Sequence, residues 1–244
     1  MINFIFVPQM ERNGFSTEWN KCYQDNTQMS IWPWSDIVSL VHRHCKPIIA
    51  GGGGRVYELG CGAGANIPLF LSLGLGYYAI EGSTTIVDQL HKRYPELSSN
   101  ILIGDFTIDA PFDGSFDLVI DRAALTHNNS KSIQRAIEAV FHSLKPGGLF
   151  IGTDWFSINH TDFLGGDSAD DEYTRDNYLN GQFAGVGAVH FSDEQHLREL
   201  FQEFEITFLE EKLSKRFEPA DQHQFASWNI VARRPFEVAF ADFH

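Results

Sequence analysis

Residues 56–66, with the sequence VYELGCGAGAN, join a short apolar run to three glycines at alternate positions. The apolar run has the length of a buried strand, and the segment after the glycines predicts the start of a helix. Gly60, Gly62 and Gly64 carry no side chain, so the backbone here can approach a bound ligand closely. The segment therefore predicts the first strand, turn and helix of an α/β domain, with a ligand site at the turn.

From Arg55 onward, short apolar runs alternate with segments of helical period, a pattern typical of βαβ units. Five runs are apolar enough to be strands buried on both faces: residues 55–59, 77–81, 100–104, 116–121 and 149–154. Two later segments, residues 204–213 and 225–233, predict a terminal strand pair. We expect a doubly wound α/β fold with a mostly parallel seven-stranded sheet and a C-terminal antiparallel strand pair.

Serine residues mark the expected starts of several helices. We expect serine caps at Ser35, Ser83, Ser130 and Ser192, the last in a capping box with Gln195. The helix through Ala136–Leu144 is expected to end at residues 145–148, because the sequence KPGG forces a turn into the next strand.

The chain divides into an arm and one α/β domain. Residues 1–54 are expected to form an N-terminal helical arm that acts as a lid, and residues 55–244 the domain itself. Within the domain, residues 156–191 are polar, rich in Gly and Asp, and too long for an ordinary connection. We expect an inserted recognition segment there, since long loops often bind ligands. The final residues 236–244 predict either a strand or a docked tail.

The formal charge of -14 and the isoelectric point near 5.0 disfavour a polyanionic partner, because phosphate backbones are bound largely by Lys and Arg. No nucleic-acid partner is therefore expected. Cys22, Cys45 and Cys61 lie far apart without a CxxC pair, which predicts neither a disulfide framework nor a zinc site. With neither a secretory leader nor a membrane-length apolar run recognised, we expect a cytoplasmic protein without a membrane partner.

Four blocks resemble, in order, the class I (Rossmann-like) S-adenosylmethionine-dependent methyltransferases of the small-molecule type. These blocks are residues 56–66, the triplet Gly104-Asp105-Phe106, residues 116–122 and residues 144–150. The resemblance covers about residues 50–155. It implies a Rossmann-like fold, a methyltransferase activity and S-adenosyl-L-methionine (SAM) as cofactor.

The resemblance also implies which residues hold the cofactor. Glu58 corresponds to the acidic residue beside the cationic amine and sulfonium, and Glu81 to the acceptor of ribose hydroxyls. Asp105 would accept the exocyclic amine of adenine, whereas Phe106 would either lend an apolar face to the ring or pack in the core. The expected cofactor-binding residues are Glu58, Gly60, Cys61, Gly62, Gly64, Asn66, Glu81, Gly82, Asp105, Phe106 and Asp121.

An NAD(P)-dependent reductase is one alternative, because residues 60–65 also fit G-x-G-x-x-A. Glu58 would repel a pyrophosphate, and the chain lacks the Tyr-x-x-x-Lys pair of a short-chain dehydrogenase. Residues 121–124, DRAA, depart from the Asn/Asp-Pro-Pro-aromatic loop of the methyltransferases that modify base amines. A small-molecule acceptor is therefore expected. A non-catalytic SAM-binding protein is a further alternative.

Methylation of a hydroxyl needs a group that takes up its proton. His127 follows the fourth strand, at the sheet edge where ligands bind, and is the expected catalytic base; packing against the Asn128-Asn129 turn is the alternative. The expected substrate-binding residues are Trp32, Trp34, Arg122, Asp154, Trp155 and His190.

We expect O-methylation of a small polar metabolite, for example a sugar or glycan precursor, while N- or S-methylation stays open. No metal is expected, since His42 and His44 are two residues apart on a predicted helix and cannot share a face. A monomer or a homodimer is expected.

Overall fold

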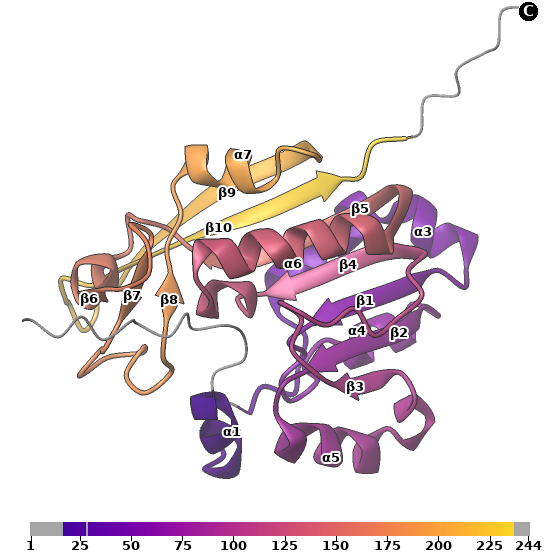
Figure 1. Cartoon of the computed structure of the whole chain (residues 1–244), viewed down its shortest axis with the longest axis horizontal. Coiled ribbons are helices and arrows are strands. Elements are labelled where there is room, and N and C mark those ends of the chain that lie inside the picture. Colours follow the sequence, from indigo (N-terminus) through magenta and orange to yellow (C-terminus); the bar gives the residue numbers. More distant parts are fainter. Residues whose placement is uncertain (1–16, 28, 237–244) are drawn as a thin grey trace, which may run out of the picture.

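The computed structural model describes residues 17–27 and 29–236. Within these residues, seven strands form the main sheet: β1 (Arg55–Leu59), β2 (Gly76–Glu81), β3 (Ile101–Ile103), β4 (Phe116–Arg122), β5 (Leu144–Phe156), β9 (Glu205–Lys215) and β10 (Gln224–Arg233). Their order is β3-β2-β1-β4-β5-β10-β9 (Figure 1), with β1 to β5 parallel and β10 antiparallel to both of its neighbours. The predicted Rossmann-like α/β class, mostly parallel sheet and terminal antiparallel pair are confirmed.

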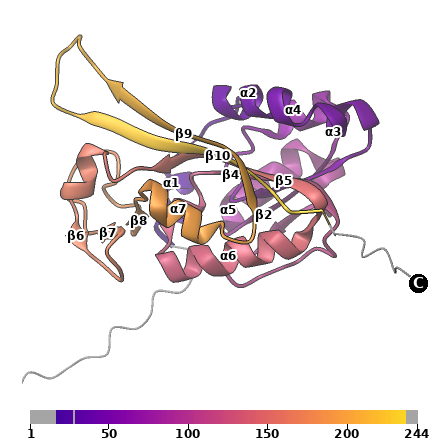
Figure 2. The ribbon, with the colours of Figure 1, turned by 90° about the horizontal axis from the view of Figure 1, so that it is seen from above.

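Helices cover both faces of this sheet: α2 (Ser35–His44), α3 (Lys46–Gly51), α4 (Ile67–Ser72) and α5 (Thr84–Arg93) on one, α6 (Ser130–Ser143) and α7 (Glu194–Leu200) on the other. Figure 2 shows α2, α3 and α4 on the side of the sheet opposite α6 and α7. Successive strand residues point to opposite faces, so Val56 packs in the α4 layer and Tyr57 in the α6 layer. Burial on both faces explains why these strands read as continuous apolar runs.

The expected turn at residues 145–148 is a bulge within β5. Helix α6 ends at Ser143, and Leu144 already pairs with Phe116 of β4. The next pair joins Leu118 to Leu149, so the KPGG residues leave the ladder between the two pairs. The predicted end of the α6 helix at Leu144 is thus wrong by one residue.

Only one of the four expected serine caps has the predicted position: the Ser83 hydroxyl accepts a hydrogen bond from the amide of Ile86. Helices α6 and α7 are capped one residue away from the predicted serines, by Asn129 and Asp193. Ser192 is unsuited to capping because its backbone amide and carbonyl bond to residues at the end of β5. Ser35 is the first residue of α2 and follows Trp34, which makes no side-chain cap.

The segment expected as a long polar insertion contains its own small sheet. It comprises the 3-10 turn η3 (Thr161–Leu164) and the antiparallel strands β6 (Asp167–Ser168), β7 (Thr174–Asp176) and β8 (Val189–His190). Phe183, Val186 and Phe191 form an apolar cluster that joins this segment to Phe156 at the end of β5. The insertion is therefore packed against the main sheet by a core of its own.

The N-terminal arm contains α1 (Thr17–Gln24), which lies apart from α2 and packs against α5. The Ser83 hydroxyl, at the start of α5, donates a hydrogen bond to the side chain of Asn20 at 2.7 Å. Two 3-10 turns complete the described elements, η1 (Pro95–Leu97) and η2 (Leu125–His127). None of the helices in the described ranges combines the length and apolar character needed to cross a bilayer. Most of the predicted C-terminal tail, residues 237–244, lies outside the described residues.

Candidate functional site

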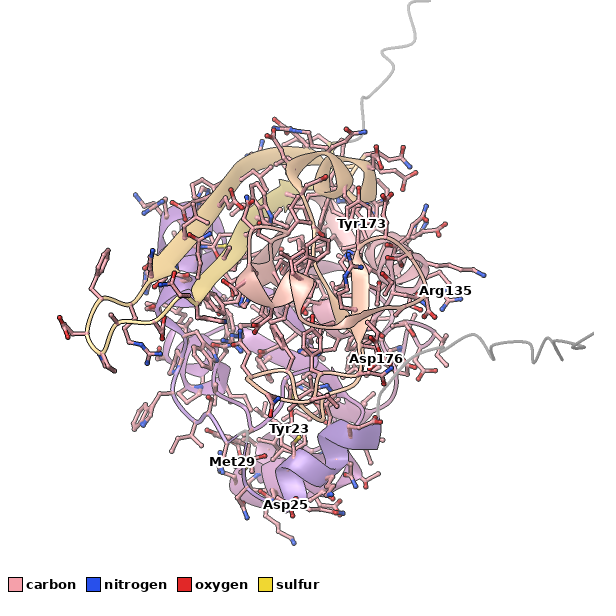
Figure 3. The ribbon with its side chains drawn as sticks, turned by 90° about the vertical axis from the view of Figure 1, so that its left-hand side faces the viewer. Tyr23, Asp25, Met29, Arg135, Tyr173 and Asp176 are labelled. Atoms are coloured by element: carbon pink, nitrogen blue, oxygen red, sulfur yellow. The ribbon has the colours of Figure 1, made fainter. Side chains whose placement is uncertain are left out.

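A cavity of about 330 Å³ lies at the carboxyl ends of β1, β2 and β4. The neighbours of β1 lead away in opposite directions along the sheet, and such a switch point is where open α/β sheets bind ligands. Helix α1 and the insertion supply the other walls. Figure 3 faces this side of the molecule and labels Tyr23 on α1 and Asp176 on β7.

The glycine turn after β1 forms one wall of this cavity. Gly60 and Gly62 have φ values of +59° and +50°, which residues with a Cβ rarely adopt. A Cβ on Gly60 would clash with the Ala124 side chain, and one on Gly62 would lie 2.9 Å from the Tyr23 hydroxyl. Gly64 instead faces the core, because its Cβ would meet Ile67 and Leu90 at 2.7 Å. Two of the three glycines thus leave room at the cavity and the third leaves room for packing.

Glu58 is buried at the floor of the cavity. Its carboxylate accepts hydrogen bonds from the Tyr77 hydroxyl at 2.5 Å and from the Asn66 amide at 2.8 Å. Burial raises the pKa of Glu58 to about 7, an effect that these two bonds oppose and the nearby Asp121 and Glu81 strengthen. A cation placed beside Glu58 would favour the carboxylate form. The site therefore suits a ligand that carries positive charge.

Glu81, at the end of β2, joins this strand to the glycine turn. One carboxylate oxygen accepts the Gly62 amide and the other the Ser83 amide, both at 2.9 Å. Burial raises the pKa of Glu81, whereas these backbone bonds lower it. The carboxylate keeps further lone pairs for the hydroxyls of a sugar.

The predicted adenine residues are placed differently from each other. Phe106 lines the cavity, but Asp105 does not. One carboxylate oxygen of Asp105 accepts hydrogen bonds from the Thr107 amide and hydroxyl at 2.9 and 2.7 Å.

Asp121 also lies off the cavity wall. It accepts hydrogen bonds from the Leu125 amide at 3.0 Å and from the Trp155 indole at 2.7 Å. Asp121 thus holds the turn after β4.

His127 lines the opposite part of the cavity. Its Nδ1 lies 3.3 Å from the Ala188 carbonyl oxygen, a contact that requires the proton on Nδ1 and leaves the lone pair on Nε2. The ring contacts Trp19 edge-on, with centroids 4.7 Å apart. Burial, and to a smaller extent Arg122, lowers the pKa of His127 to about 4, while the Ala188 bond opposes this. The imidazole is therefore neutral at pH 7.

Arg122 and Trp34 form a stacked pair on the cavity wall. The guanidinium carbon lies 3.7 Å from the indole centroid, a cation–π arrangement. Nε and Nη2 of Arg122 each lie 2.9 Å from the same carboxylate oxygen of Asp154, which itself is not part of the wall. Asp154 thus fixes the arginine from behind.

Three other predicted substrate residues do not reach the cavity. Trp32 is 75% exposed, whereas Trp155 is fully buried between the sheet and α7. His190 is also fully buried, and its Nε2 lies 3.1 Å from Nε2 of His196. The site brings together the remaining predictions: His127, Glu58, Gly60, Cys61, Gly62, Asn66, Glu81, Gly82, Phe106, Trp34 and Arg122.

Several wall residues were not foreseen from the sequence: Trp19, Tyr23, Ser30, Asn128, Gln182, Phe183 and Val186. Trp19 and Tyr23 are four residues apart, so α1 presents both on one face. In the insertion, the sequence feature that could have indicated a cavity wall is the pair of apolar residues Phe183 and Val186 within the glycine-rich stretch 181–187. Both pairs come from segments that meet the main sheet only through tertiary packing.

A family model and a curated relative each match part of this chain. Residues 57–152 match the family model described as a methyltransferase domain. The tRNA N(3)-methylcytidine methyltransferase Mettl2 of Drosophila melanogaster is 25% identical over 155 residues, which are 59% of this chain and 46% of the fly protein. The chain thus spans about half the length of that curated relative.

Solved structures share the fold. A SAM-dependent methyltransferase from Methanosarcina mazei has a TM-score of 0.61 at 21% identity, covering 78% of this chain and 98% of that protein. The cyclase SpnF has a TM-score of 0.60 at 16% identity, covering 92% of this chain and all of its own. Fold and switch-point cavity define a Rossmann-like α/β protein. The family match at residues 57–152 places a methyltransferase domain on the strands and turn that form this cavity.

The cavity residues fit SAM as cofactor. Glu58 is a buried carboxylate that neutral donors hold, so it can receive the cationic amine and sulfonium. Gly60 and Gly62 leave the backbone open, Glu81 would accept hydrogen bonds from ribose hydroxyls, and Phe106 would offer an aromatic face to adenine. These residues would hold the cofactor, which would supply an electrophilic methyl group.

Proposed function

We propose that this protein methylates a hydroxyl group of a small polar metabolite, with His127 as general base. Bound SAM supplies a methyl group that is already electrophilic on a positively charged sulfur. The protein must therefore align the acceptor and remove its proton. The acceptor oxygen would gain the methyl group as the bond between that carbon and the sulfur breaks, S-adenosylhomocysteine would be the leaving group, and Nε2 of His127 would take up the proton. The observation that carries the proposal is the neutral His127 ring in the cavity wall, with Nδ1 fixed by Ala188.

A sugar or glycan precursor is the acceptor class that these walls favour. Trp19, Trp34 and Phe183 offer aromatic faces, on which the apolar faces of sugar rings stack. Asn128 and Gln182 add side-chain amides that can bond to hydroxyl groups. Arg122 contributes positive charge, which suits an acidic or phosphorylated sugar, although Asp154 neutralises part of it.

RNA is the second candidate acceptor, because the fly relative is a tRNA methyltransferase. The formal charge of -14 opposes it, since an RNA backbone would meet an acidic surface. N-methylation of a base would also place less demand on His127, because a base nitrogen can attack without losing a proton first. The two candidates therefore differ in charge requirement and in the role of His127.

The test is methyl transfer from methyl-labelled SAM to two acceptor pools, one of hydroxylated metabolites including sugar phosphates, and one of total tRNA. We expect label in the metabolite pool and a loss of turnover of about 100-fold or more in His127→Ala. His42→Ala, on an exposed residue of α2, is the matched control and should retain full turnover. Label in tRNA alone, or unchanged turnover in His127→Ala, would contradict the proposal.

A further inference from the structure

A second group of chemistry-bearing side chains lies outside the methyl-transfer site. His160, Asp162 and His223 each offer one ligating atom, and these atoms lie within 4.8 Å of one another. Oδ2 of Asp162 lies 3.3 Å from Nε2 of His223 and 3.9 Å from Nδ1 of His160. Imidazole nitrogens and a carboxylate oxygen are ligands that divalent transition metals prefer.

The fold brings these residues together from two distant segments. His160 caps the η3 turn that contains Asp162, whereas His223 directly precedes β10. Hydrogen bonds between backbone and side-chain groups hold the two segments together. The backbone amide of Gln224 donates to the Thr161 hydroxyl at 2.8 Å. The Gln224 side chain also donates to the Asn159 carbonyl at 3.0 Å. These two bonds hold the residue after His223 next to the segment that contains His160 and Asp162.

The surroundings of His160 resemble the apolar shell of a metal site. Its side chain is fully buried, and the rings of Phe183 and Phe225 have centroids 5.5 and 5.0 Å from its own. The His223 ring lies 5.1 Å away, and His223 itself is held by a bond from its amide to Asp221. An apolar shell around convergent polar ligands limits solvent access and strengthens metal binding.

A metal ion bound at Nδ1 of His160 would replace an existing hydrogen bond of this ring. Nδ1 lies 3.1 Å from the Asp162 amide, and Nε2 lies 2.8 Å from the Gln182 side-chain amide. A neutral ring accepts at only one nitrogen. With the Gln182 amide turned so that its oxygen faces the ring, Nε2–H donates to it. The Nδ1 lone pair then accepts the Asp162 amide in the metal-free protein, and this bond gives way when Nδ1 binds the metal.

We propose that His160, Asp162 and His223 bind a divalent transition metal ion, for which Zn²⁺ has the matching ligand preference. Ligand atoms at roughly 2.0–2.1 Å from a tetrahedral zinc lie about 3.3–3.4 Å apart. The Asp162–His223 distance of 3.3 Å already meets this requirement, and the 3.9 Å between His160 and Asp162 needs a small side-chain adjustment. Water completes the coordination.

The metal would join the insertion to the start of β10 and act on the methyl-transfer cavity through Gln182. This side chain contacts His160 and also lines the cavity. The ion is a positioning element rather than a reactant, because its ligands are not cavity-wall residues. The proposal is independent of the acceptor's identity, and it departs from the sequence-based expectation of no metal.

The test uses the full chain without a histidine tag, stripped of metal and titrated with Co²⁺ and then Zn²⁺. We expect one equivalent of Co²⁺ to give the visible absorption of a tetrahedral site with nitrogen and oxygen ligands, and Zn²⁺ to displace it. Asp162→Asn and His223→Ala should weaken Zn²⁺ binding by about 100-fold or more, and Gln182→Ala by about 10- to 100-fold. His42→Ala should bind as the parent protein does.

Circular dichroism of the metal-free variants separates loss of binding from loss of fold. His223 and Asp162 are partly exposed, so both variants should unfold near the parent's temperature without metal, and only the parent should gain thermal stability from Zn²⁺. Absence of the Co²⁺ band in the parent, or equal Zn²⁺ affinity in the parent and Asp162→Asn, would overturn the proposal. If His223→Ala does not fold, the Zn²⁺ affinity of the isosteric variant Asp162→Asn still tests the proposal.

Discussion

The Tyr77 hydroxyl donates a 2.5 Å hydrogen bond to Glu58, and both side chains are buried beneath the glycine turn. The Tyr77 hydroxyl and the Asn66 amide fix the carboxylate, and both of these donors are neutral. The carboxylate therefore stands where a cationic ligand can complete its environment. Its protonation and the binding of the cofactor should consequently be coupled.

The first prediction concerns the pH dependence of cofactor binding. The pKa of Glu58 is raised to about 7, chiefly by burial, so below pH 7 the free protein is increasingly protonated there. A cationic cofactor favours the carboxylate, so binding releases a proton and affinity falls as the pH falls. We expect a loss of about tenfold per unit below pH 7. Calorimetric titration with S-adenosylmethionine from pH 5.5 to 8 measures it.

The control for this prediction is Glu58→Gln, which keeps the size of the side chain and removes the titration. Its affinity should be lower than that of the parent at pH 8 and nearly independent of pH. If the affinity of the parent protein depends as little on pH as that of the variant, then Glu58 is not the group whose protonation is coupled to cofactor binding.

The second prediction concerns the glycine turn. An alanine at position 60 would adopt a φ of +59° and place its Cβ against Ala124. Gly74→Ala is a matched control, since Gly74 has a φ of +69° but nothing within 4 Å of the added Cβ. We expect a cost of about 1–2 kcal/mol in unfolding free energy for the control. Gly60→Ala should cost about 1–3 kcal/mol more because of the clash.

Urea unfolding of both variants measures this difference, and binding of S-adenosylhomocysteine separates packing from ligand loss. Gly60→Ala should lose cofactor binding, whereas Gly74→Ala should retain it. Equal stability of the two variants would mean that Ala124 moves aside without cost.

The residues around the glycine turn were predictable because their roles are local. Glu58 and Gly60 lie within three residues of each other on one strand and turn, and Glu81 ends the next strand. A strand and a turn fix such positions almost independently of the rest of the chain. The parallel sheet followed in the same way from apolar runs that are buried on both faces.

The other half of the cavity depends on contacts between distant segments. Trp155 is the second-last residue of β5, and it was expected to bind the substrate, yet its side chain turns into the core and bonds to Asp121. Phe183 reaches the cavity because the insertion packs on Phe156. His160 and His223 are 63 positions apart in the printed sequence, so no local spacing reveals that they meet. Sequence patterns carry no direct information on such long-range placements.

The third prediction concerns acid stability. Burial, with a smaller effect from His196, lowers the pKa of His190 to about 3. The unfolded chain therefore binds a proton at this residue near its ordinary pKa of about 6.5, where the folded chain does not. The contribution of His190 to stability is complete above pH 6.5 and is lost as the pH falls through the folded-state pKa.

Urea unfolding at pH 7.5 and pH 5 of the parent and of His190→Gln checks this prediction. The free energy of unfolding should fall more steeply with decreasing pH in the parent than in the variant. His42→Gln, on an exposed residue, should follow the parent. Parallel slopes in the parent and His190→Gln would assign the acid sensitivity to other groups.

The fourth prediction concerns Trp155, which is fully buried and donates its indole N–H to Asp121 at 2.7 Å. Trp155→Phe keeps most of the aromatic packing but leaves that carboxylate oxygen without its donor. The loss should lower the free energy of unfolding by about 1–3 kcal/mol, the cost of an unsatisfied buried polar group. It should also loosen the turn that Asp121 holds through the Leu125 amide, and with it the position of His127.

Trp32→Phe is the matched control, because Trp32 is 75% exposed and its substitution should change stability by less than about 0.5 kcal/mol. Equal unfolding midpoints in urea would show that the Trp155–Asp121 bond contributes nothing net, whereas a loss of turnover in Trp155→Phe with unchanged cofactor affinity would connect this buried bond to the placement of the base.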